Sequence, residues 1–433
     1  HVNFSPLFGH QYSHAWIDFS SVAAIGFGLT AYGVGVERGW ITREQAAART
    51  LTTLRYLWRL PQGPAPAGVS GHRGFFYHFL NYADGTRFRT VELSTIDTSL
   101  LLMGALFAQS FFDGAAPDEQ AIRAYADSLY RRVEWTWIQP RAPLVSMGWH
   151  PESGFIRADW AGYNEAMLLY VLALASPTHP IAPAAWTAWT STYQWRSYRG
   201  HEHVNFSPLF GHQYSHAWID FRGIRDAYMR ERGIDYVENA RRATYSQRAY
   251  AIANPQGFAG YDSLTWGLTA CDGPADTTVT WNGRPLRLRT YWARGVSANA
   301  DVEGEAAERD DGTIAPTAAI GSVAFAPEIV LPTMVAMRER YGRTLFDRYG
   351  FRDAFNPSVR DPAIRSPSGT IDATTGWVGR DYLGIDQGPI LLMLENWRSD
   401  LVWRVMRRNP YIVRGLRRAG FTGGWLETST LGR

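Results

Sequence analysis

Residues 161–170 read Ala161-Gly-Tyr-Asn-Glu-Ala-Met-Leu-Leu-Tyr170, and the fold can be worked out from this stretch outward. A turn rich in aromatic and amide side chains ends here and an apolar run begins. The apolar residues of the run recur at helical spacing, which predicts a helix over about 163–175 with one face in a core. Glu165 therefore lies at the start of a buried helix. From its spacing alone, a helix-capping role and a catalytic role are about equally good explanations of a glutamate there.

Two further carboxylates occupy similar places. Asp97 ends the segment Glu92-Leu-Ser-Thr-Ile-Asp97 before a long apolar helix, and Asp386 lies in Gly384-Ile-Asp-Gln-Gly-Pro389 before another. Asp97 comes three residues after Ser94, where the helix dipole favours a negative charge, and Asp386 is a good N-cap by position. Spacing alone therefore favours a capping role for both.

Helix signals recur along the chain. Thr42-Arg-Glu-Gln45 is a capping box that predicts a helix to about Leu60, and Ser94 is the predicted N-cap of a helix through Phe111. Asn282-Gly283 predicts a β-hairpin within 277–292. The other predicted helices cover about 20–32, 117–135, 183–194, 221–232, 235–253, 315–323, 327–341, 389–407 and 410–419.

Ten to twelve helices in successive pairs fit one all-α toroid of helical hairpins with a small β-hairpin insertion. A two-domain α/β chain would need parallel strands alternating with helices, and the sequence has no such pattern. An acidic loop is predicted at 299–312. The Pro- and Ser-rich segment 356–376 is long for a structureless loop, so we interpret it as a lid or a cleft wall.

Composition narrows the function. The 433 residues carry a net charge of +3, all basic residues are Arg, and these are scattered among acids, which argues against nucleic acid as a partner. No apolar run reaches membrane-span length, and no signal peptide precedes the domain, although a mature form would have lost one. Aromatic residues make up 14%, and many adjoin Gly, Asp and His in predicted loops, an arrangement that suits stacking on sugar rings.

Residues 1–19 recur letter for letter at 203–221. Repeats in natural folds drift and return at regular periods, so a single perfect copy is not a structural repeat. We interpret residues 1–19 as an artefact or a displaced segment and assign site residues only to the second copy. The catalytic domain is then expected over 20–433.

Neither a metal nor a cofactor is predicted. His212-Gln-Tyr-Ser-His216 has the zinc spacing, but it lacks the glutamate of H-E-x-x-H and a third ligand. Cys271, the single cysteine, has no neighbouring histidine to activate it and is expected to pack in the core. Gly26-Phe-Gly28 lacks the strand and the third glycine of a phosphate-binding loop.

Several segments taken together resemble the bacterial glucoamylase-like domain family. That family includes endo-β-1,2-glucanases and is related to the transglycosylation domain of cyclic β-1,2-glucan synthases. The resemblance runs in the family's order from Ser21 to about residue 425. The segments that carry it are Ser21-Val-Ala-Ala-Ile-Gly-Phe-Gly-Leu-Thr-Ala-Tyr, Gly39-Trp-Ile-Thr, Gly74-Phe-Phe-Tyr-His-Phe, Leu93-Ser-Thr-Ile-Asp-Thr, Tyr163-Asn-Glu-Ala-Met, Trp266-Gly-Leu-Thr-Ala and Gly384-Ile-Asp-Gln-Gly-Pro.

The resemblance implies an (α/α)6 toroid with a cleft at one end and hydrolysis of β-1,2-glucan, with endo action and inversion expected. It implies a periplasmic or secreted location, with the cytoplasm as the alternative. A poly- or oligosaccharide is the expected partner, neither a membrane nor nucleic acid is, and we expect a monomer or a weak homodimer. The family normally has an extra helix and an Asp-Arg stretch before Ser21, where this chain carries the copied peptide.

The resemblance also places Glu165, Asp97 and Asp386 in the cleft, reversing the capping interpretation of the two aspartates. Glycoside hydrolysis needs two carboxyl groups, roughly 5–5.5 Å apart for retention and roughly 6.5–9.5 Å for inversion. We expect Glu165 to be the acid and Asp386 or Asp97 to serve the base side. The expected substrate-binding residues are Glu92, Trp149, His150, Tyr163, His212, Gln213, His216, Trp266 and Tyr382.

Three alternatives remain open at this point. A transglycosylase would use the same cleft and pass the glycosyl unit to another sugar. A hydrolase of a different glucan linkage would share the fold, which does not choose the linkage. A glucan-binding protein with a dead cleft would be expected to lack a carboxylate, yet all three are present.

Overall fold

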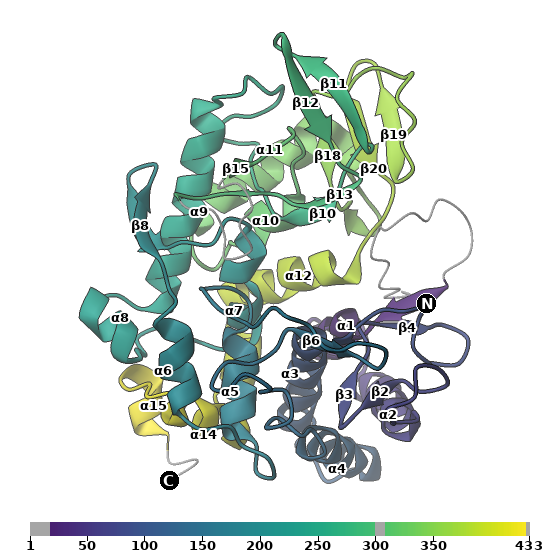
Figure 1. Cartoon of the computed structure of the whole chain (residues 1–433), viewed down its shortest axis with the longest axis vertical. Coiled ribbons are helices and arrows are strands. Elements are labelled where there is room, and N and C mark those ends of the chain that lie inside the picture. Colours follow the sequence, from purple (N-terminus) through teal and green to yellow (C-terminus); the bar gives the residue numbers. More distant parts are fainter. Residues whose placement is uncertain (1–17, 299–307, 430–433) are drawn as a thin grey trace.

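The computed structural model describes residues 18–298 and 308–429. The copied peptide lies outside the described residues except for its last two positions, as does most of the predicted acidic loop at 299–312. The chain is predominantly helical (Figure 1). The helices are α1 (Val22–Glu37), α2 (Arg43–Arg59), α3 (Thr95–Phe111), α4 (Pro117–Arg131), α5 (Met167–Ala175), α6 (Ala184–Thr190), η1 (Leu209–His212), α7 (Tyr214–Trp218), α8 (Ala227–Arg232), α9 (Tyr236–Ala253), α10 (Pro316–Ile320), α11 (Pro327–Leu345), α12 (Gly384–Ser399), α13 (Leu401–Met406), α14 (Pro410–Arg418) and α15 (Gly424–Thr428).

The predicted helix starts with capping residues are confirmed. The hydroxyl of Thr42 accepts the backbone N–H of Gln45 at 3.2 Å, and the Gln45 side chain accepts the N–H of Thr42 at 3.0 Å, which closes the capping box of α2. Ser94 caps α3 by accepting the N–H of Asp97 at 3.1 Å. These caps satisfy N–H groups that a helix start leaves without partners.

Two helix predictions are corrected. The predicted helix 389–407 begins earlier, at Gly384, so Asp386 lies in the first turn of α12 and is not its N-cap. It also divides in two, because Asp400 adopts a left-handed backbone with φ of +61° and separates α12 from α13. The short helices η1 and α7 were not predicted, since four and five residues are too few to show a periodicity.

The strands are short and pair antiparallel. Asn282 and Gly283 both have positive φ, of +50° and +75°, and join β11 to β12 in the predicted hairpin. The segment 356–376, predicted as a lid or cleft wall, contributes β19 and one residue each of β18 and β20 to the three-stranded sheet β18–β20–β19. The strands are β1 (Phe19–Ser21), β2 (Gly71–His72), β3 (Phe75–Phe76), β4 (Phe79–Asn81), β5 (Leu93–Ser94), β6 (Gly148–His150), β7 (Gly154–Phe155), β8 (Trp195–Tyr198), β9 (His201–Val204), β10 (Ala270–Asp272), β11 (Thr277–Trp281), β12 (Arg284–Leu288), β13 (Tyr291–Ala293), β14 (Gly295–Val296), β15 (Glu308–Arg309), β16 (Phe346–Asp347), β17 (Gly350–Phe351), β18 (Phe355–Asn356), β19 (Gly369–Asp372) and β20 (Gly376–Gly379).

The arrangement places α12 between two halves of the molecule. The strands β11, β12, β18, β19 and β20 gather at one end, and α1, α3 and α5 lie on the other side of α12 (Figure 1). Helix α1 packs against α3 and α12, α3 packs against α5, and α12 packs against α7 and α10. Among the described residues, no helix combines the length and the apolarity that crossing a bilayer requires.

Small residues let α1 and α3 approach closely. A Cβ atom added to Gly104 would lie 2.1 Å from the carbonyl oxygen of Gly26, well inside van der Waals contact. A Cβ added to Gly26 would in turn lie 2.1 Å from the carbonyl oxygen of Leu100. The backbones therefore touch, which explains why the sequence over 20–32 is rich in small residues.

We expect Gly104→Ala to lower the free energy of unfolding by about 1–3 kcal/mol, because the added methyl group forces two helix backbones apart. Chemical denaturation would measure the loss. The control is Gly63→Ala, whose added Cβ would meet only Val69 at 3.5 Å. Equal stabilities for the two variants would show that the close approach is not needed.

Candidate active site

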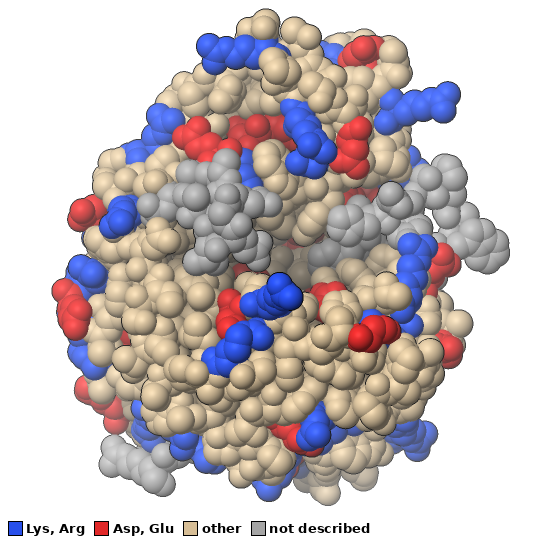
Figure 2. Space-filling model, viewed as in Figure 1, with Lys and Arg blue, Asp and Glu red and all other residues tan. Residues whose placement is uncertain are grey.

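Three carboxyl groups line one pocket. Asp97 comes from the first turn of α3, Glu165 from the turn before α5, and Asp386 from the first turn of α12. The cavity measures about 160 Å³, and its other lining residues are His78, Ile96, Leu100, Phe210, Tyr214, Ala270, Cys271, Tyr291, Leu383 and Ile385. Figure 2 shows a hollow near the centre of this face, with acidic and arginine side chains around it. The three predicted catalytic residues are thus brought together.

Hydrogen bonds from neighbouring elements fix the backbone at two of these positions. Ser215 of α7 donates its hydroxyl to the carbonyl oxygen of Glu165 at 3.0 Å and accepts the N–H of Leu168 at 3.0 Å. Thr317 of α10 donates its hydroxyl to the carbonyl oxygen of Asp386, also at 3.0 Å. The pocket carboxyls therefore sit on helix starts that other helices hold in place.

His78 joins two of the acidic residues. Its Nδ1 lies 2.8 Å from Oε1 of Glu92, and its Nε2 lies 3.5 Å from Oδ1 of Asp97. Burial alone would lower the pKa of His78, but the charges of Asp97 and Glu92, with the hydrogen bond to Glu92, raise it to about 9. His78 is therefore an imidazolium at neutral pH, and Glu92, predicted to bind substrate, stands behind it without lining the pocket.

Asp97 itself is nearly enclosed. Burial raises its pKa, while the charge of His78 and a hydrogen bond donated by the Ser94 hydroxyl work in the other direction. Burial likewise favours the neutral form of Glu92, yet its hydrogen bond and ion pair with His78 prevail and lower its pKa. Glu92, His78 and Asp97 thus form a row in which the histidine lies between the two acidic side chains.

Asp386 belongs to a cluster of buried aspartates. Its pKa is raised well above the ordinary value, first by burial, then by the charge of Asp353 and a hydrogen bond between the two carboxyl groups. Burial raises the pKa of Asp353 to about 6, although the hydrogen bond from Asp386 and one from the backbone N–H of Asp272, at 2.8 Å, favour its ionised form. Burial and mutual repulsion thus raise the pKa values of both carboxyl groups, and sequence reasoning missed Asp353.

Three other predicted substrate-binding residues do not line the pocket. Trp149 and His150 are half-buried on β6, where Trp149 packs near His72 and the His150 ring lies 3.3 Å from a guanidinium nitrogen of Arg87. Tyr382 immediately precedes Leu383, which lines the pocket, and its ring packs against Tyr349.

The two histidines predicted to contact sugar are corrected to core residues. His212 and His216 are fully buried. Burial lowers the pKa of His212 well below its ordinary value and that of His216 to about 3, so both rings are neutral. His216 packs between Phe221 and Phe325. In the part of the chain that the structure describes, no group of three or more His, Cys, Asp or Glu residues could hold a metal ion.

Tyr163, Gln213 and Trp266 are likewise buried and do not line the pocket. Gln213 donates its amide to the carbonyl oxygen of Ala318 at 2.7 Å, and Trp266 donates its indole N–H to Thr333 at 2.8 Å. The side-chain groups of Gln213 and Trp266 thus find partners inside the protein, where an unpaired polar group is costly. All three side chains belong to the buried interior.

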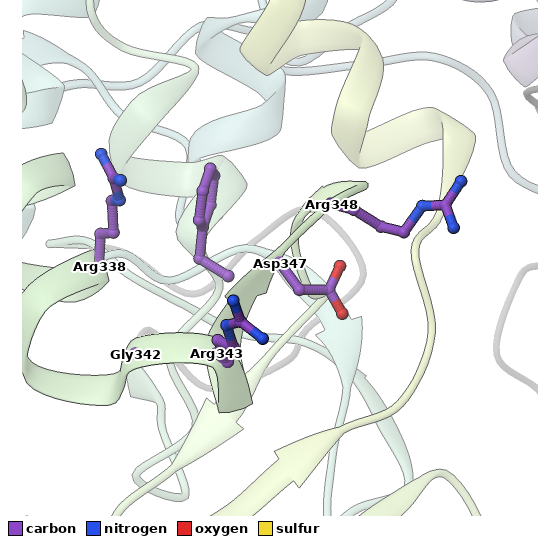
Figure 3. Close-up of a pocket in the computed structure, with 6 residues that line it drawn as sticks. Arg338, Gly342, Arg343, Asp347 and Arg348 are labelled. Carbon is purple, nitrogen blue, oxygen red and sulfur yellow. The ribbon is translucent and has the colours of Figure 1, made fainter.

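A second cavity lies at the surface beside α11 and β16. It measures about 670 Å³ and is lined by Arg338, Gly342, Arg343, Phe346, Asp347 and Arg348 (Figure 3). Its arginines are exposed, and Arg348 points away from Arg338 and Arg343. Its single carboxylate, Asp347, lies 3.4 Å from the guanidinium of Arg352. A cavity with one carboxylate lacks the two groups that acid–base chemistry needs, so the smaller, buried pocket is the candidate active site.

Helix starts in this protein bring three carboxyl groups to one pocket, and glycoside hydrolysis requires such a grouping of carboxyl groups. Residues 157–410 match the family model described as "Glycoamylase: Putative glucoamylase". Since the match covers more than half of the sequence, the chain belongs to this family.

The chain is similar to several characterised proteins. It is 28% identical over 437 residues to an exo β-1,2-glucooligosaccharide sophorohydrolase (non-reducing end) of Parabacteroides distasonis, with 93% of this chain and 53% of the relative covered. The chain thus spans about half the length of that relative. An endo-β-1,2-glucanase of Chitinophaga pinensis, solved with sophorotriose and glucose, superposes with a TM-score of 0.77 at 28% identity, covering 96% of this chain and 91% of that one. An endo-β-1,2-glucanase of Talaromyces funiculosus shares the fold at 10% identity and a TM-score of 0.58, covering 95% of this chain and 84% of that one.

Proposed function

We propose that the chain is a glycoside hydrolase that cleaves β-1,2-glucan and releases short sophoro-oligosaccharides. The observation that carries the proposal is the convergence of Asp97, Glu165 and Asp386 on one pocket, in a chain whose relatives act on β-1,2-linked glucose. Endo action is the form proposed here. It is supported by similarity over 91% of the length of the endo-acting Chitinophaga enzyme, compared with 53% of the exo-acting relative.

In the proposed mechanism, Glu165 protonates the glycosidic oxygen as the bond breaks. Asp386 takes a proton from the attacking water, which gives inversion at the anomeric carbon. Asp97, held by Ser94 and His78, accepts a hydrogen bond from a sugar hydroxyl. The aromatic residues Tyr214 and Tyr291 supply flat walls for sugar rings.

The proposed scaffold for this chemistry is one (α/α)6 toroid over residues 20–433. The contacts of α1 with α3 and α12, of α3 with α5, of α5 and α12 with α7, and of α10 with α12 support an inner layer made of α1, α3, α5, α7, α10 and α12. A periplasmic or secreted location, as a monomer or weak homodimer, completes the proposal.

Product analysis tests the proposed function. Linear β-1,2-glucan is incubated with the protein, with β-1,3- and α-1,4-glucans as controls, and the anomeric form of the first products is followed by proton NMR. Short sophoro-oligosaccharides with inverted configuration, from β-1,2-glucan alone, are the expected result. Longer or cyclic products would show that the protein is a transglycosylase and not a hydrolase. Turnover of another linkage alone would contradict β-1,2-glucan as the substrate.

A further inference from the structure

We infer that His78 and Glu92 form a positioning unit for Asp97: the His78 ring holds Asp97 as a charged hydrogen-bond acceptor in the pocket, and Glu92 holds the ring in place. The sugar hydroxyl that Asp97 would meet rests on the proposed hydrolysis. Glu92 does not line the pocket, so it acts through His78 and not by touching substrate.

The contacts on the two sides of the His78 ring require a proton on each ring nitrogen. Nδ1 lies 2.8 Å from Oε1 of Glu92, and Nε2 lies 3.5 Å from Oδ1 of Asp97. An ionised carboxylate only accepts hydrogen bonds, so a neutral imidazole, which has one donor nitrogen, would turn a lone pair towards one of the two. The imidazolium instead donates a hydrogen bond to Glu92 and forms an ion pair with Asp97.

Neighbouring groups fix the ring and the carboxylate in these places. The His78 ring stacks on that of Phe79 with the ring centroids 4.0 Å apart, and the backbone N–H of His78 donates to the carbonyl oxygen of Glu92 at 3.0 Å. The other carboxyl oxygen of Asp97, Oδ2, accepts the hydroxyl of Ser94. Asp97 also lies in the first turn of α3, where the helix dipole favours a negative charge. Asp97 is thus held at both oxygens before a substrate arrives.

His78 is the one basic residue among the described residues that line the pocket. Burial raises the pKa of Asp97, and the charge of His78 is the largest of the effects that oppose burial. With a neutral side chain in place of His78, the Ser94 hydroxyl and the backbone at the start of α3 would be left to oppose it. Asp97 would then bind a proton at higher pH and would donate where the sugar hydroxyl needs an acceptor.

The other titratable groups around the row do not supply a replacement charge. Burial raises the pKa of Glu92 and His78 outweighs that effect, with a smaller contribution from His150 of β6. Residues 19–25, in β1 and the first turn of α1, carry no titratable side chain. Glu165 precedes α5. The remaining titratable groups that line the pocket have pKa values raised by burial, which favours their neutral forms, and they are Tyr214 of α7, Cys271 of β10, Tyr291 of β13 and Asp386 of α12.

The test is the pH dependence of sophorotriose binding, measured by calorimetry in the Glu165→Gln background, where turnover is suppressed. Adding His78→Gln keeps a donor beside Asp97 but removes the charge. The pH below which affinity is lost should therefore move up by about 1–3 pH units, since an opposite charge at this distance lowers the pKa of a carboxyl group by that much. An unchanged midpoint would overturn the inference, because a purely structural role would lower affinity equally at every pH.

The matched control adds His201→Gln to the same background. The His201 ring lies outside the pocket, with its centroid 5.7 Å from that of Tyr245, so its replacement should leave the midpoint unchanged. A midpoint that moved equally in both histidine variants would contradict a specific role for His78.

Nitrogen-15 NMR of histidine-labelled protein, without sugar, tests the positioning unit independently of the proposed function. In wild type, both ring nitrogens of His78 should stay protonated up to about pH 9, and Glu92→Gln should lower that midpoint by about one pH unit or more. A neutral His78 ring in wild type near neutral pH would overturn the inference, even if the His78 variant does not fold. A protein that binds no β-1,2-glucan but carries this imidazolium would contradict the proposed function and support the positioning of Asp97.

Discussion

Glu165→Gln is expected to lower kcat on β-1,2-glucan by about 10²-fold or more, with little change in stability. Glutamine keeps the shape of the side chain at the mouth of α5 but has no proton to give to the leaving oxygen, and losing a general acid typically costs this much. Initial rates of reducing-sugar release would measure the loss. The matched control is Glu134→Gln, which changes a partly exposed glutamate on Arg73 and should keep wild-type kcat.

A second substrate separates an acid from a residue that only binds. An aryl β-sophoroside with an acidic phenol as leaving group needs little protonation, so Glu165→Gln should lose far less activity on it than on the polysaccharide. An equal loss on both substrates would contradict the acid role and leave Glu165 as a binding residue.

Arg294→Met is expected to destabilise the protein by about 3–5 kcal/mol. The guanidinium and Asp311 are both fully buried, joined by two hydrogen bonds of 2.7 Å, and the same guanidinium also donates to the carbonyl oxygens of Cys271 and Arg289. Methionine fills similar space but leaves a carboxylate without its partner in the core, the costly half of breaking a buried ion pair. Urea denaturation followed by tryptophan fluorescence would measure the change.

The control for this stability loss is Arg340→Met. Arg340 pairs with Asp262 at 2.6 Å on the surface, where solvent screens the charges, so its loss should cost no more than about 1 kcal/mol. The double variant Arg294→Met/Asp311→Leu should recover part of the loss, because it removes the stranded charge. A single variant as stable as the Arg340 control would show that the buried pair contributes nothing.

Much of the fold could be predicted because its signals are local. A Thr-x-x-Gln box, a serine before an apolar helix and an Asn-Gly dipeptide each act within four residues, so Thr42, Ser94 and the turn at 282–283 correctly marked element starts and ends. The start of α12 was predicted wrongly. Pro389 indicated the first turn of a helix, yet it lies inside a helix that begins at Gly384. Proline position alone could not show where the earlier turn begins.

In the site, too, the residues within sequence motifs were predicted and the others were not. The three pocket carboxylates stand in motifs, and the family resemblance brought them together in advance. His78 lies in one of the quoted motifs, Gly74-Phe-Phe-Tyr-His-Phe, and that position was the only signal for it in the sequence analysis. Asp353 and Asp272 carry no motif: Asp272 lies on the short strand β10, and Asp353 lies between β17 and β18. Conversely, His212 and His216 have a functional-looking spacing but are neutral core side chains, because periodicity cannot show burial in a short helix.

The pocket carboxyls come from chain positions as far apart as Asp97 and Asp386, and the family match begins only at residue 157. A gene fragment encoding the matched region alone would therefore supply two of the three carboxyls. It would lack α1, against which α12 packs, and α3, against which α5 packs. Such a fragment would carry an incomplete site on an incomplete scaffold. In evolutionary terms, the pocket is inherited with the chain from α1 onward or not at all, so shortened copies of the gene would be expected to decay rather than diverge.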